Sequence, residues 1–247
     1  MQGPEFFERF NVLYNNIMSN AAPGLDAFEV SEFLTKAQLE LVKNHFSKRG
    51  NKYQEGYGDS AKRQTEFAKL IVSTVLQKAT TNITNTFDSR SKAYQAPLDL
   101  LLTLNESITF SSGGNTHHKV IIPIDYTEYN RLMSKPFGGP NRNQAWRIDF
   151  TSNGSTYYEI VTYEDIPNMV YHIRYVKRPK PIIVSNLSSL GNLSIDGITT
   201  QTDCELDESL HEEILQRAVE LAKAAYSSDQ SGQVQMQNQI TVGQRSE

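Results

Sequence analysis

Apolar residues recur at three- and four-residue spacing in four stretches of the chain, which is the pattern of a helix with one buried face. The clearest stretch covers residues 203–229, where Asp207 suits the N-cap and glutamates occupy the first turns, at the positive end of the helix dipole. Earlier stretches predict helices over residues 4–19, over residues 31–50, and from about residue 60 to residue 76.

Capping residues and connections set expectations for how these helices begin, end and pack. Ser31 suits the N-cap of the second helix and Gly50 its C-cap, and residues 27–30 before it indicate a short strand or a turn. A short charged connection should let the second and third helices pair antiparallel. Because the helix at 203–229 follows a β-like middle, we expect it to return and pack on the N-terminal helices.

From about residue 80 the pattern changes to alternation and to short β-branched runs, which are typical of strands. In residues 169–177 the side chains of Val170, His172, Arg174 and Val176 should share one face. Asn153-Gly154 joins two such runs and is the strongest hairpin signal in the chain. Further patterns predict a strand within residues 97–110 that ends in a polar turn, strands over 119–124 and 145–150, and one helical turn over 126–133.

These elements predict an α+β fold, in which N-terminal helices and a C-terminal helix form a helical bundle layer beside a central antiparallel β region. The expected segments are residues 1–95 for the helical part, 96–182 for the β region, 183–230 for a return segment with the C-terminal helix, and 231–247 for a Gln-rich C-terminal arm. An arm of this composition buries little, so it either hangs loose or becomes ordered along a neighbouring subunit.

Composition and charge narrow the class of protein. The 247-residue chain has a net charge of −4, so no global basic field favours nucleic acid. Cys204 is the only cysteine, which excludes an intramolecular disulfide and suits a reducing compartment. Neither a signal-peptide pattern nor a long apolar run occurs, so we expect a protein made inside a cell that does not span a membrane.

No group of residues has the spacing of a catalytic or metal site. His117 and His118 are adjacent, so on a strand they point apart, and no further ligand type lies beside them. We expect His172 to be packed or half-exposed in its strand, and His211 to lie on the exposed side of the terminal helix. Cys204 has acidic neighbours, which raise a thiol pKa rather than activate it. We therefore predict neither enzyme activity nor a metal or cofactor.

The Gly- and Pro-rich loop over residues 135–147 combines basic and aromatic side chains, and it supports two interpretations. Lys135, Arg142 and Arg147 beside Phe137 and Trp146 suit a contact with nucleic acid. The same residue types are the usual anchors of protein–protein interfaces, which is the interpretation we favour. The expected interface residues are Phe137, Asn141, Arg142 and Trp146 in the loop, with Gln235, Gln237 and Ile240 in the C-terminal arm.

Three stretches of the chain together resemble one family. They are FEVSEFLTKAQLELVKNHF (residues 28–46), MSKPFGGPNRNQAWRI (133–148), and VKRPKPIIV (176–184) leading to CELDESLHEEILQRAVELA (204–222). This combination resembles the ring, or head-to-tail connector (portal adaptor), structural proteins of crAss-like tailed phages. The resemblance covers most of the chain, and its motifs are structural rather than catalytic.

The resemblance implies a virion protein of the phage neck or tail, assembled in the host bacterial cytoplasm. It implies a homo-oligomeric ring, twelve-fold to match a portal, that contacts the portal protein and neighbouring ring or tail proteins. Genomic DNA would pass through the lumen without specific binding. The alternatives are a DNA-binding accessory protein that uses the loop from Lys135 to Arg147 and, ranked last, a hydrolase.

Overall fold

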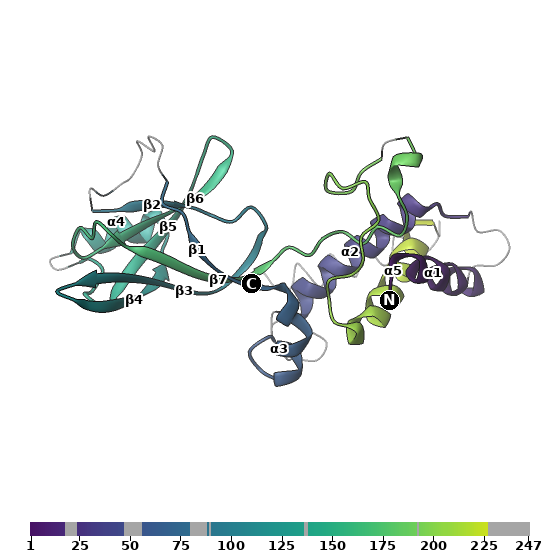
Figure 1. Ribbon diagram of the computed structural model, residues 1–247, viewed down its shortest axis with the longest axis horizontal. Helices are drawn as coiled ribbons and strands as arrows, with labels where there is room; N and C mark the ends of the chain where they lie inside the picture. Colours follow the sequence, from purple (N-terminus) through teal and green to yellow (C-terminus); the bar gives the residue numbers. More distant parts are fainter. Residues whose placement is uncertain are drawn as a thin grey trace. The chain divides into compact units, whose positions relative to one another are not determined.

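The computed structural model describes residues 1–17, 24–46, 56–79, 88, 90–135, 138–191 and 193–226 (Figure 1). The chain forms two compact units, a helical unit of Met1–Leu70 with Pro179–Glu247 and a β unit of Ile71–Arg178. The chain thus leaves the helical unit once, builds the β unit, and returns. The segment boundary predicted between residues 95 and 96 falls after the first two strands of the β unit, which begins at Ile71.

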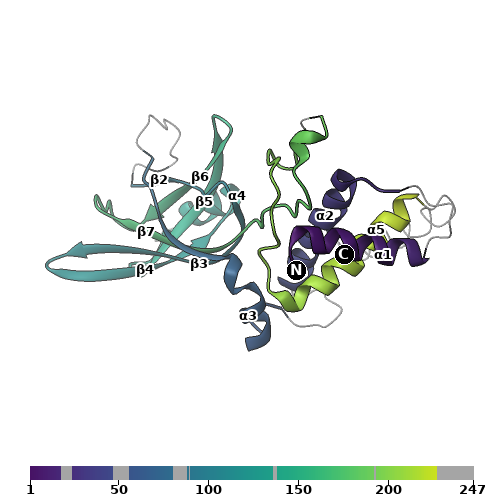
Figure 2. The same cartoon turned by 45° about the vertical axis from the view of Figure 1, so that its right-hand side comes forward.

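The helical unit is built on three longer helices and several short ones. They are α1 (Gly3–Ile17), α2 (Ala27–Phe46), α3 (Ala61–Phe67), η1 (Ala68–Leu70), η2 (Leu187–Ser189), η3 (Glu208–Leu210) and α5 (His211–Tyr226). Helix α5 packs on both α1 and α2, as Figures 1 and 2 also show. The predicted return of the C-terminal helix to the N-terminal helices is therefore confirmed.

Helix α2 begins earlier than its sequence pattern predicts. Asp26 and Glu29 form a reciprocal capping box, in which the Asp26 side chain accepts from the Glu29 amide at 2.8 Å and Glu29 accepts from the Asp26 amide at 3.0 Å. Ser31 lies inside the helix, where its hydroxyl donates to the Ala27 carbonyl at 2.6 Å. The predicted N-cap at Ser31 and the predicted strand or turn at residues 27–30 are wrong, because an acidic pair at 26 and 29 provides the cap.

One face of α2 holds the segment that returns from the β unit. Ser31 accepts from the Val184 amide at 3.1 Å, Thr35 accepts from the Ile182 amide at 3.1 Å, and Gln38 donates to the Lys180 carbonyl at 3.2 Å. These three residues lie on one side of the helix because their spacing is four and three residues. The contacts satisfy backbone groups that an extended, buried segment would otherwise leave unpaired.

The predicted third helix is split between a helix and a strand. Ser60 caps α3 by accepting from the Arg63 amide at 3.3 Å, but the helix ends at Phe67 and η1 follows it. Strand β1 (Ile71–Leu76) then begins the β unit. Its sequence IVSTVL is dense in β-branched side chains, which disfavour a helix and favour a strand.

In the described part of the β unit seven strands form one sheet, which closes on itself. The strands are β1, β2 (Lys92–Gln95), β3 (Leu100–Ser112), β4 (Asn115–Pro123), β5 (Gln144–Ser152), β6 (Ser155–Thr162) and β7 (Val170–Lys177), in the order β1-β7-β3-β4-β5-β6-β2. Beyond β1 the chain pairs with β2, through a bridge of Lys78 with Tyr94 and a bond from the Ala79 amide to the Ala93 carbonyl at 2.9 Å. This pairing covers the outer edge of β2, which would otherwise be a free edge of the sheet.

The strand pairs are antiparallel with one exception. β4 and β5 run parallel, with Val120 opposite Gln144 and Pro123 opposite Arg147. The predicted antiparallel β region is therefore corrected to a mixed sheet. The strand predicted within residues 97–110 was expected to end in a polar turn. β3 instead continues through these polar residues, since Ser107 to Ser112 pair regularly with β4.

The sheet has an inner and a partly covered outer face. The inner core contains Ile108, Ile121, Ile160, Tyr171 and Ile173. On the outer face α4 (Tyr126–Met133) covers β5 and β6, and Tyr129 packs with Trp146, Ile148 and Val161 (Figure 2). Along β7 burial alternates from Val170 to Tyr175, because Tyr171, Ile173 and Tyr175 are buried while Val170 and Arg174 are exposed. Val176, predicted to share the face of Val170, is buried as well. Of the helices in the described ranges, none has the length and apolar character to cross a membrane.

Candidate interaction surfaces

Four of the residues predicted from sequence to form an interface lie outside the described residues. They are Phe137, Gln235, Gln237 and Ile240. Asn141 and Arg142, in the loop before β5, are exposed. The Arg142 guanidinium lies 5.8 Å from the ring centroid of Tyr163, which is itself 50% exposed. This cation–aromatic pair is available to a partner, as expected for a contact surface.

Trp146 occupies a different environment from Asn141 and Arg142. Its side chain is only 7% exposed, and its ring meets that of Tyr129 edge-on at 6.3 Å. The aromatic pair ties α4 to β5 and so stabilises the outer face of the sheet. An interface role for Trp146 stays a prediction, and little of its side chain is accessible for it.

Arg147 is largely buried, with 12% of its side chain exposed, in an ion-pair cluster on the inner side of the sheet. Its guanidinium donates to Glu106 and pairs with Asp149 at 2.8 Å, and it lies 4.7 Å from the ring centroid of Tyr158. Burial lowers the pKa of Arg147, but the Glu106 and Asp149 carboxylates raise it by more than burial lowers it. The net pKa of Arg147 is therefore above its ordinary value. Arg147 therefore has its charge satisfied within the fold, and the DNA-binding alternative cannot use it at the surface.

A second polar cluster fastens the chain before β2 to β6. Glu159 is fully buried, and Ser91 donates to it at 2.6 Å. Arg90 pairs with Asp88 at 2.5 Å, and this hydrogen bond lowers the pKa of the Asp88 carboxyl. Tyr129 donates to Asp88 at 3.2 Å, and burial raises the pKa of Tyr129 to about 12. Each group has a partner in the fold, which identifies the cluster as structural.

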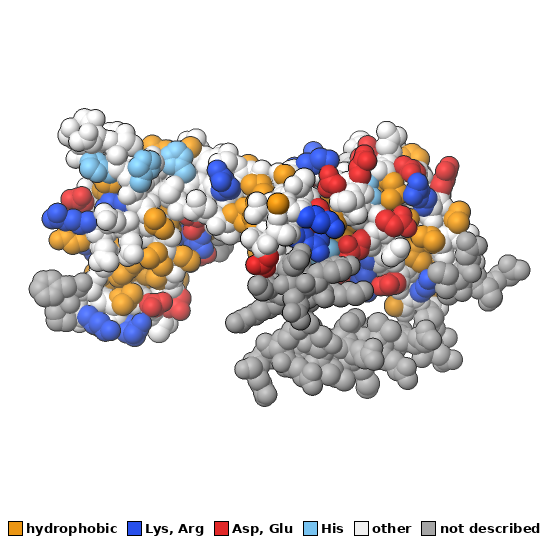
Figure 3. All heavy atoms as spheres, turned by 90° about the horizontal axis from the view of Figure 1, so that it is seen from below, with side chains coloured by type: hydrophobic (Ala, Val, Ile, Leu, Met, Phe, Trp, Pro, Cys, Tyr) orange, Lys and Arg blue, Asp and Glu red, His pale blue; other side chains and the backbone are white. Residues whose placement is uncertain are grey.

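Histidines gather at the surface of the β unit (Figure 3). His117 and His118 are exposed in β4, and His117 stacks on Phe110 at 5.3 Å. His172 is half-buried and bonds to the Thr109 hydroxyl at 2.9 Å. No three potential metal-ligating residues come together within the described parts of the chain.

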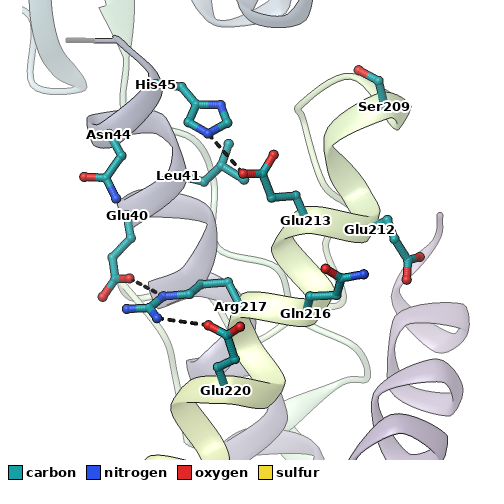
Figure 4. Close-up of a pocket in the computed structure, with 10 residues that line it drawn as sticks. All are labelled: Glu40, Leu41, Asn44, His45, Ser209, Glu212, Glu213, Gln216, Arg217 and Glu220. Carbon is teal, nitrogen blue, oxygen red and sulfur yellow. Dashed lines mark hydrogen bonds and ion pairs between the residues drawn. The ribbon is translucent and has the colours of Figure 1, made fainter. Parts of the chain in front are cut away.

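A groove of about 450 Å³ lies between α2 and α5 (Figure 4). Arg217 of α5 donates to Glu40 of α2 at 2.8 Å and to Glu220 at 3.1 Å. At the other end His45 pairs with Glu213 at 3.1 Å. Glu212 lies 3.7 Å from Arg9 of α1, so the adjacent acids Glu212 and Glu213 bind separate partners and do not form a catalytic pair.

His45 links three helices through its two ring nitrogens. Arg63 of α3 donates to Nδ1 at 2.7 Å, so Nδ1 must accept and Nε2–H must donate to Glu213. Arg63 also pairs with Glu66 at 2.8 Å. Burial lowers the pKa of His45, and the charge of Arg63 lowers it further against the opposing effect of Glu213.

Two further residues were assigned roles from sequence. Burial raises the pKa of the Cys204 thiol to about 11, in agreement with a structural and unreactive cysteine. His211 was predicted to lie on the exposed side of the terminal helix, and this is wrong. It is only 4% exposed and packs on the ring of Phe6, because its face of α5 is the one that meets α1.

A second groove lies beside β5, and sequence reasoning missed it. β4 separates from β5 after Pro123, and the space between β5 and the start of α4 forms a groove of about 440 Å³. It is lined by Pro123, Ile124, Asp125, Tyr126, Glu128, Ile148 and Asp149. The parallel pairing of β4 with β5 creates it, and no local pattern predicts that pairing.

The described residues thus present charged grooves and exposed loops, and no described cluster has the arrangement of a catalytic centre. The chain belongs to the phage tail ring protein 3/4 family, and the match to this family covers residues 1–234.

Two relatives come from one virus, Bacteroides phage crAss001. The chain is 48% identical over 244 residues to its "Ring protein 4/5", covering 98% of each chain. It is 28% identical over 231 residues to its "Ring protein 3", covering 90% of this chain and 95% of that one. The chain is therefore a crAss-like phage structural ring protein, and the names of its relatives point to a non-enzymatic role.

Proposed function

We propose that this chain is a ring subunit of the head-to-tail connector, which joins the portal to the tail in the virion and surrounds the DNA channel. Identical subunits form a homo-oligomeric ring, twelve-fold to match a portal, in the neck of a particle assembled in the host cytoplasm. The ring contacts the portal protein and neighbouring ring or tail proteins. It works through assembly, without cofactor or catalysis.

The observation that carries the proposal is the likeness along the full chain to two differently numbered ring proteins of one phage. Related chains that occupy successive rings would share one fold and differ at the faces that meet their neighbours. Rings built by head-to-tail contacts need two different complementary surfaces on each subunit. The exposed loop with Asn141 and Arg142 is one candidate surface, and Phe137 and Trp146 are proposed to belong to it.

The packed helices α1, α2 and α5 are proposed to form a helical layer that stacks around the axis of the ring. Genomic DNA passes through the lumen without specific binding. A net charge of −4 agrees with weak affinity for DNA, because binding to phosphates depends on Lys and Arg. Arg147 is satisfied by Glu106 and Asp149, which leaves the DNA-binding alternative with fewer exposed cations.

Mass photometry of the purified chain, with and without the portal protein, tests the proposal. We expect closed oligomers of one size, and co-purification with portal or tail proteins from virions. Cryo-microscopy of the virion then shows the number of subunits and the height of the ring. A chain that stays monomeric with the portal present, and is absent from purified particles, contradicts the proposal.

The C-terminal arm is proposed to contribute Gln235, Gln237 and Ile240 to a neighbouring subunit. We expect deletion of residues 232–247 to leave the unfolding midpoint unchanged and to reduce the oligomer fraction in mass photometry. Scrambling the order of these residues is the matched control, since it keeps their composition. Normal assembly of the truncated chain would show that the arm does not contribute to the contact between subunits.

A further inference from the structure

Beyond their shared pairing, β4 and β5 each have a segment with one unpaired side. β5 pairs with β4 only from Gln144 to Arg147, although it continues to Ser152. β4 pairs with β5 only from Val120 to Pro123, although it begins at Asn115. Within the described ranges no strand lies on that side of β5 after Arg147, or on that side of β4 before Val120.

The backbone hydrogen bonds between β4 and β5 show which way the backbone groups of each strand point. The Ile124 amide donates to the Arg147 carbonyl at 2.9 Å, so Arg147 directs its backbone groups towards β4. Alternation every two residues then directs those of Asp149 and Thr151 to the same side, where β4 has already left. By the same rule, the Val120 amide donates to the Asn143 carbonyl at 3.1 Å, so Thr116 and His118 direct theirs to the unpaired side of β4.

The two unpaired edges lie at opposite ends of the sheet. Since Val120 is opposite Gln144, the position opposite His118 is residue 142, and Asp149 lies seven residues further along β5. Seven residues of strand span roughly 23 Å. One chain cannot bring its own two edges together, but the edge of one copy can meet the other edge of a second copy.

The tip of the β3–β4 hairpin is suited to strand pairing. Residues 111–118 are all exposed, and Gly113 and Gly114 have φ of 61° and 83°, which a tight hairpin turn requires. Phe110 stacks on His117 at 5.3 Å and stiffens the base of the tip. Natural proteins protect exposed edges with charge, proline or a bulge, and residues 111–118 contain no proline, lysine or acidic residue.

The groove beside the β5 edge complements this hairpin in charge. Asp125, Glu128 and Asp149 contribute three carboxylates to the lining; Glu128 also pairs with Arg131 and Asp149 with Arg147, and neither arginine lines the groove. The exposed tip of the hairpin, residues 111–118, contains His117 and His118 and no acidic residue, while Lys119 beyond it is buried. Imidazole N–H groups and carboxylates form favourable hydrogen bonds, which are stronger when the imidazole is charged.

We infer that the β3–β4 hairpin of one subunit adds its β4 edge to the open β5 edge of the next subunit, with its histidines over the acidic groove. This inference rests on the proposed ring function and specifies the contact between identical subunits. Strand addition of this kind derives affinity from main-chain hydrogen bonds and specificity from adjacent side-chain sites. The contact joins two different surfaces, so it can propagate around a ring.

Cysteine cross-linking between separately purified copies tests the contact directly. In a C204S background, one set of chains carries a single cysteine at Thr116, His117 or His118, and the other carries it at Asp149 or Thr151. Strand pairing brings some of these positions within the 4.4–6.8 Å between Cα atoms that a disulfide needs, and mixing all six combinations covers either strand direction. We expect a cross-linked dimer in at least one mixture and no disulfide within a chain that carries both cysteines.

Charge reversal gives an independent measurement under the same conditions. His118→Glu places an acid on the acidic groove, and we expect it to weaken association by about tenfold in mass photometry. Thr127→Glu is the matched control, because Thr127 is exposed on α4 and does not line the groove. A cysteine at Leu98, which is 90% exposed, is the control for accidental collisions.

The outcomes separate this inference from the proposed function. Closed oligomers that neither cross-link at these positions nor respond to His118→Glu contradict the hairpin contact and leave the ring function standing. If the cysteines on β5 cross-link to residues 232–247 and not to the hairpin, the C-terminal arm occupies the β5 edge and the inference is overturned. A chain that is monomeric at every concentration, with the portal present, overturns both.

Discussion

At the scale of single residues, Glu106 holds the polar centre of the β unit together. Its side chain is 5% exposed, accepts from the Tyr171 hydroxyl at 2.6 Å and pairs with Arg147. Glu106→Gln keeps the shape and removes the charge, which leaves Arg147 with the exposed Asp149 as its remaining anion. We expect a loss of about 3 kcal/mol in the free energy of unfolding, because a buried cation loses its main partner.

Urea unfolding of the two proteins measures this loss. Glu128→Gln is the control, because the Glu128 side chain pairs with Arg131 at 3.2 Å and both side chains are exposed. Exposed pairs contribute about 0–1 kcal/mol, so the control should unfold almost as the parent does. Equal stabilities of the Glu106 and Glu128 variants would show that the buried pair contributes nothing.

His45 makes the stability of the helical unit depend on pH. Burial and Arg63 lower its pKa in the folded state, so the unfolded chain binds the proton more readily. Stability is then fully present above the unfolded pKa of about 6.5 and falls as the pH decreases below it. The slope contributed by one such histidine is at most about 1.4 kcal/mol per pH unit. His211, whose pKa is also lowered by burial, adds to the same trend.

Thermal or urea unfolding between pH 7.5 and about pH 5 measures that slope. We expect His45→Gln to reduce it, whatever its effect on the stability at neutral pH. His118→Gln is the control for loss of a histidine, because His118 lies exposed in the β unit, outside the helical unit and its polar contacts. A stability that rises on acidification, or a slope indifferent to His45, is incompatible with the buried neutral imidazole.

At the scale of elements, local signals predicted the structure wherever a local interaction sets it. Asp207 accepts from the Ser209 amide at 3.1 Å and caps the entry to α5, as its sequence position indicates. The β5–β6 turn is another such case. The start of α2 was misplaced because two suitable caps, Asp26 and Ser31, stand five residues apart, and Ser31 is used for packing instead.

The turn between β5 and β6 yields a prediction at this scale. Asn153 and Gly154 have φ of 50° and 76°, the left-handed values of a two-residue hairpin turn. Gly154→Val forces a β-branched residue into this region, and we expect it to destabilise the β unit by about 1–2 kcal/mol. Gly139→Ala is the matched control, since its φ is not in the left-handed region and nothing lies within 4 Å of an added Cβ.

Differential unfolding of these two glycine variants checks the prediction. The Gly154 variant should lose stability while keeping the far-UV spectrum of the parent, because register is also set by the eight residue pairs from Ala145–Thr162 to Ser152–Ser155. An unchanged Gly154 variant would mean that the turn adopts another conformation. A destabilised Gly139 variant would mean that its loop is less open than the structure shows.

At the scale of the whole molecule, the segments that carry the candidate surfaces could be predicted from the sequence, but not how the fold brings these segments together. The loop with Asn141 and Arg142 was recognised from its glycines and basic residues. Trp146 and Arg147 belong to the same sequence motif, yet both are largely buried, because alternation along β5 turns one under α4 and the other inward. The groove beside β5 depends on a parallel pair between distant strands, which has no local signature.

The division into two units predicts different behaviour for two fragments. Residues 71–178 form a continuous chain with a closed sheet, and its ends lie side by side because Ile71 pairs with Val176. We expect this fragment to fold alone and to unfold in one urea transition. Residues 1–70 lack α5 and the returning segment, so the faces of α1 and α2 that pack on α5 are left bare, and we expect that fragment to be unfolded. Circular dichroism and amide exchange of both fragments measure this. A structured 1–70 fragment would show that the helical unit folds without α5 and the returning segment. An unfolded 71–178 fragment would show that the β unit needs the helical unit in order to fold.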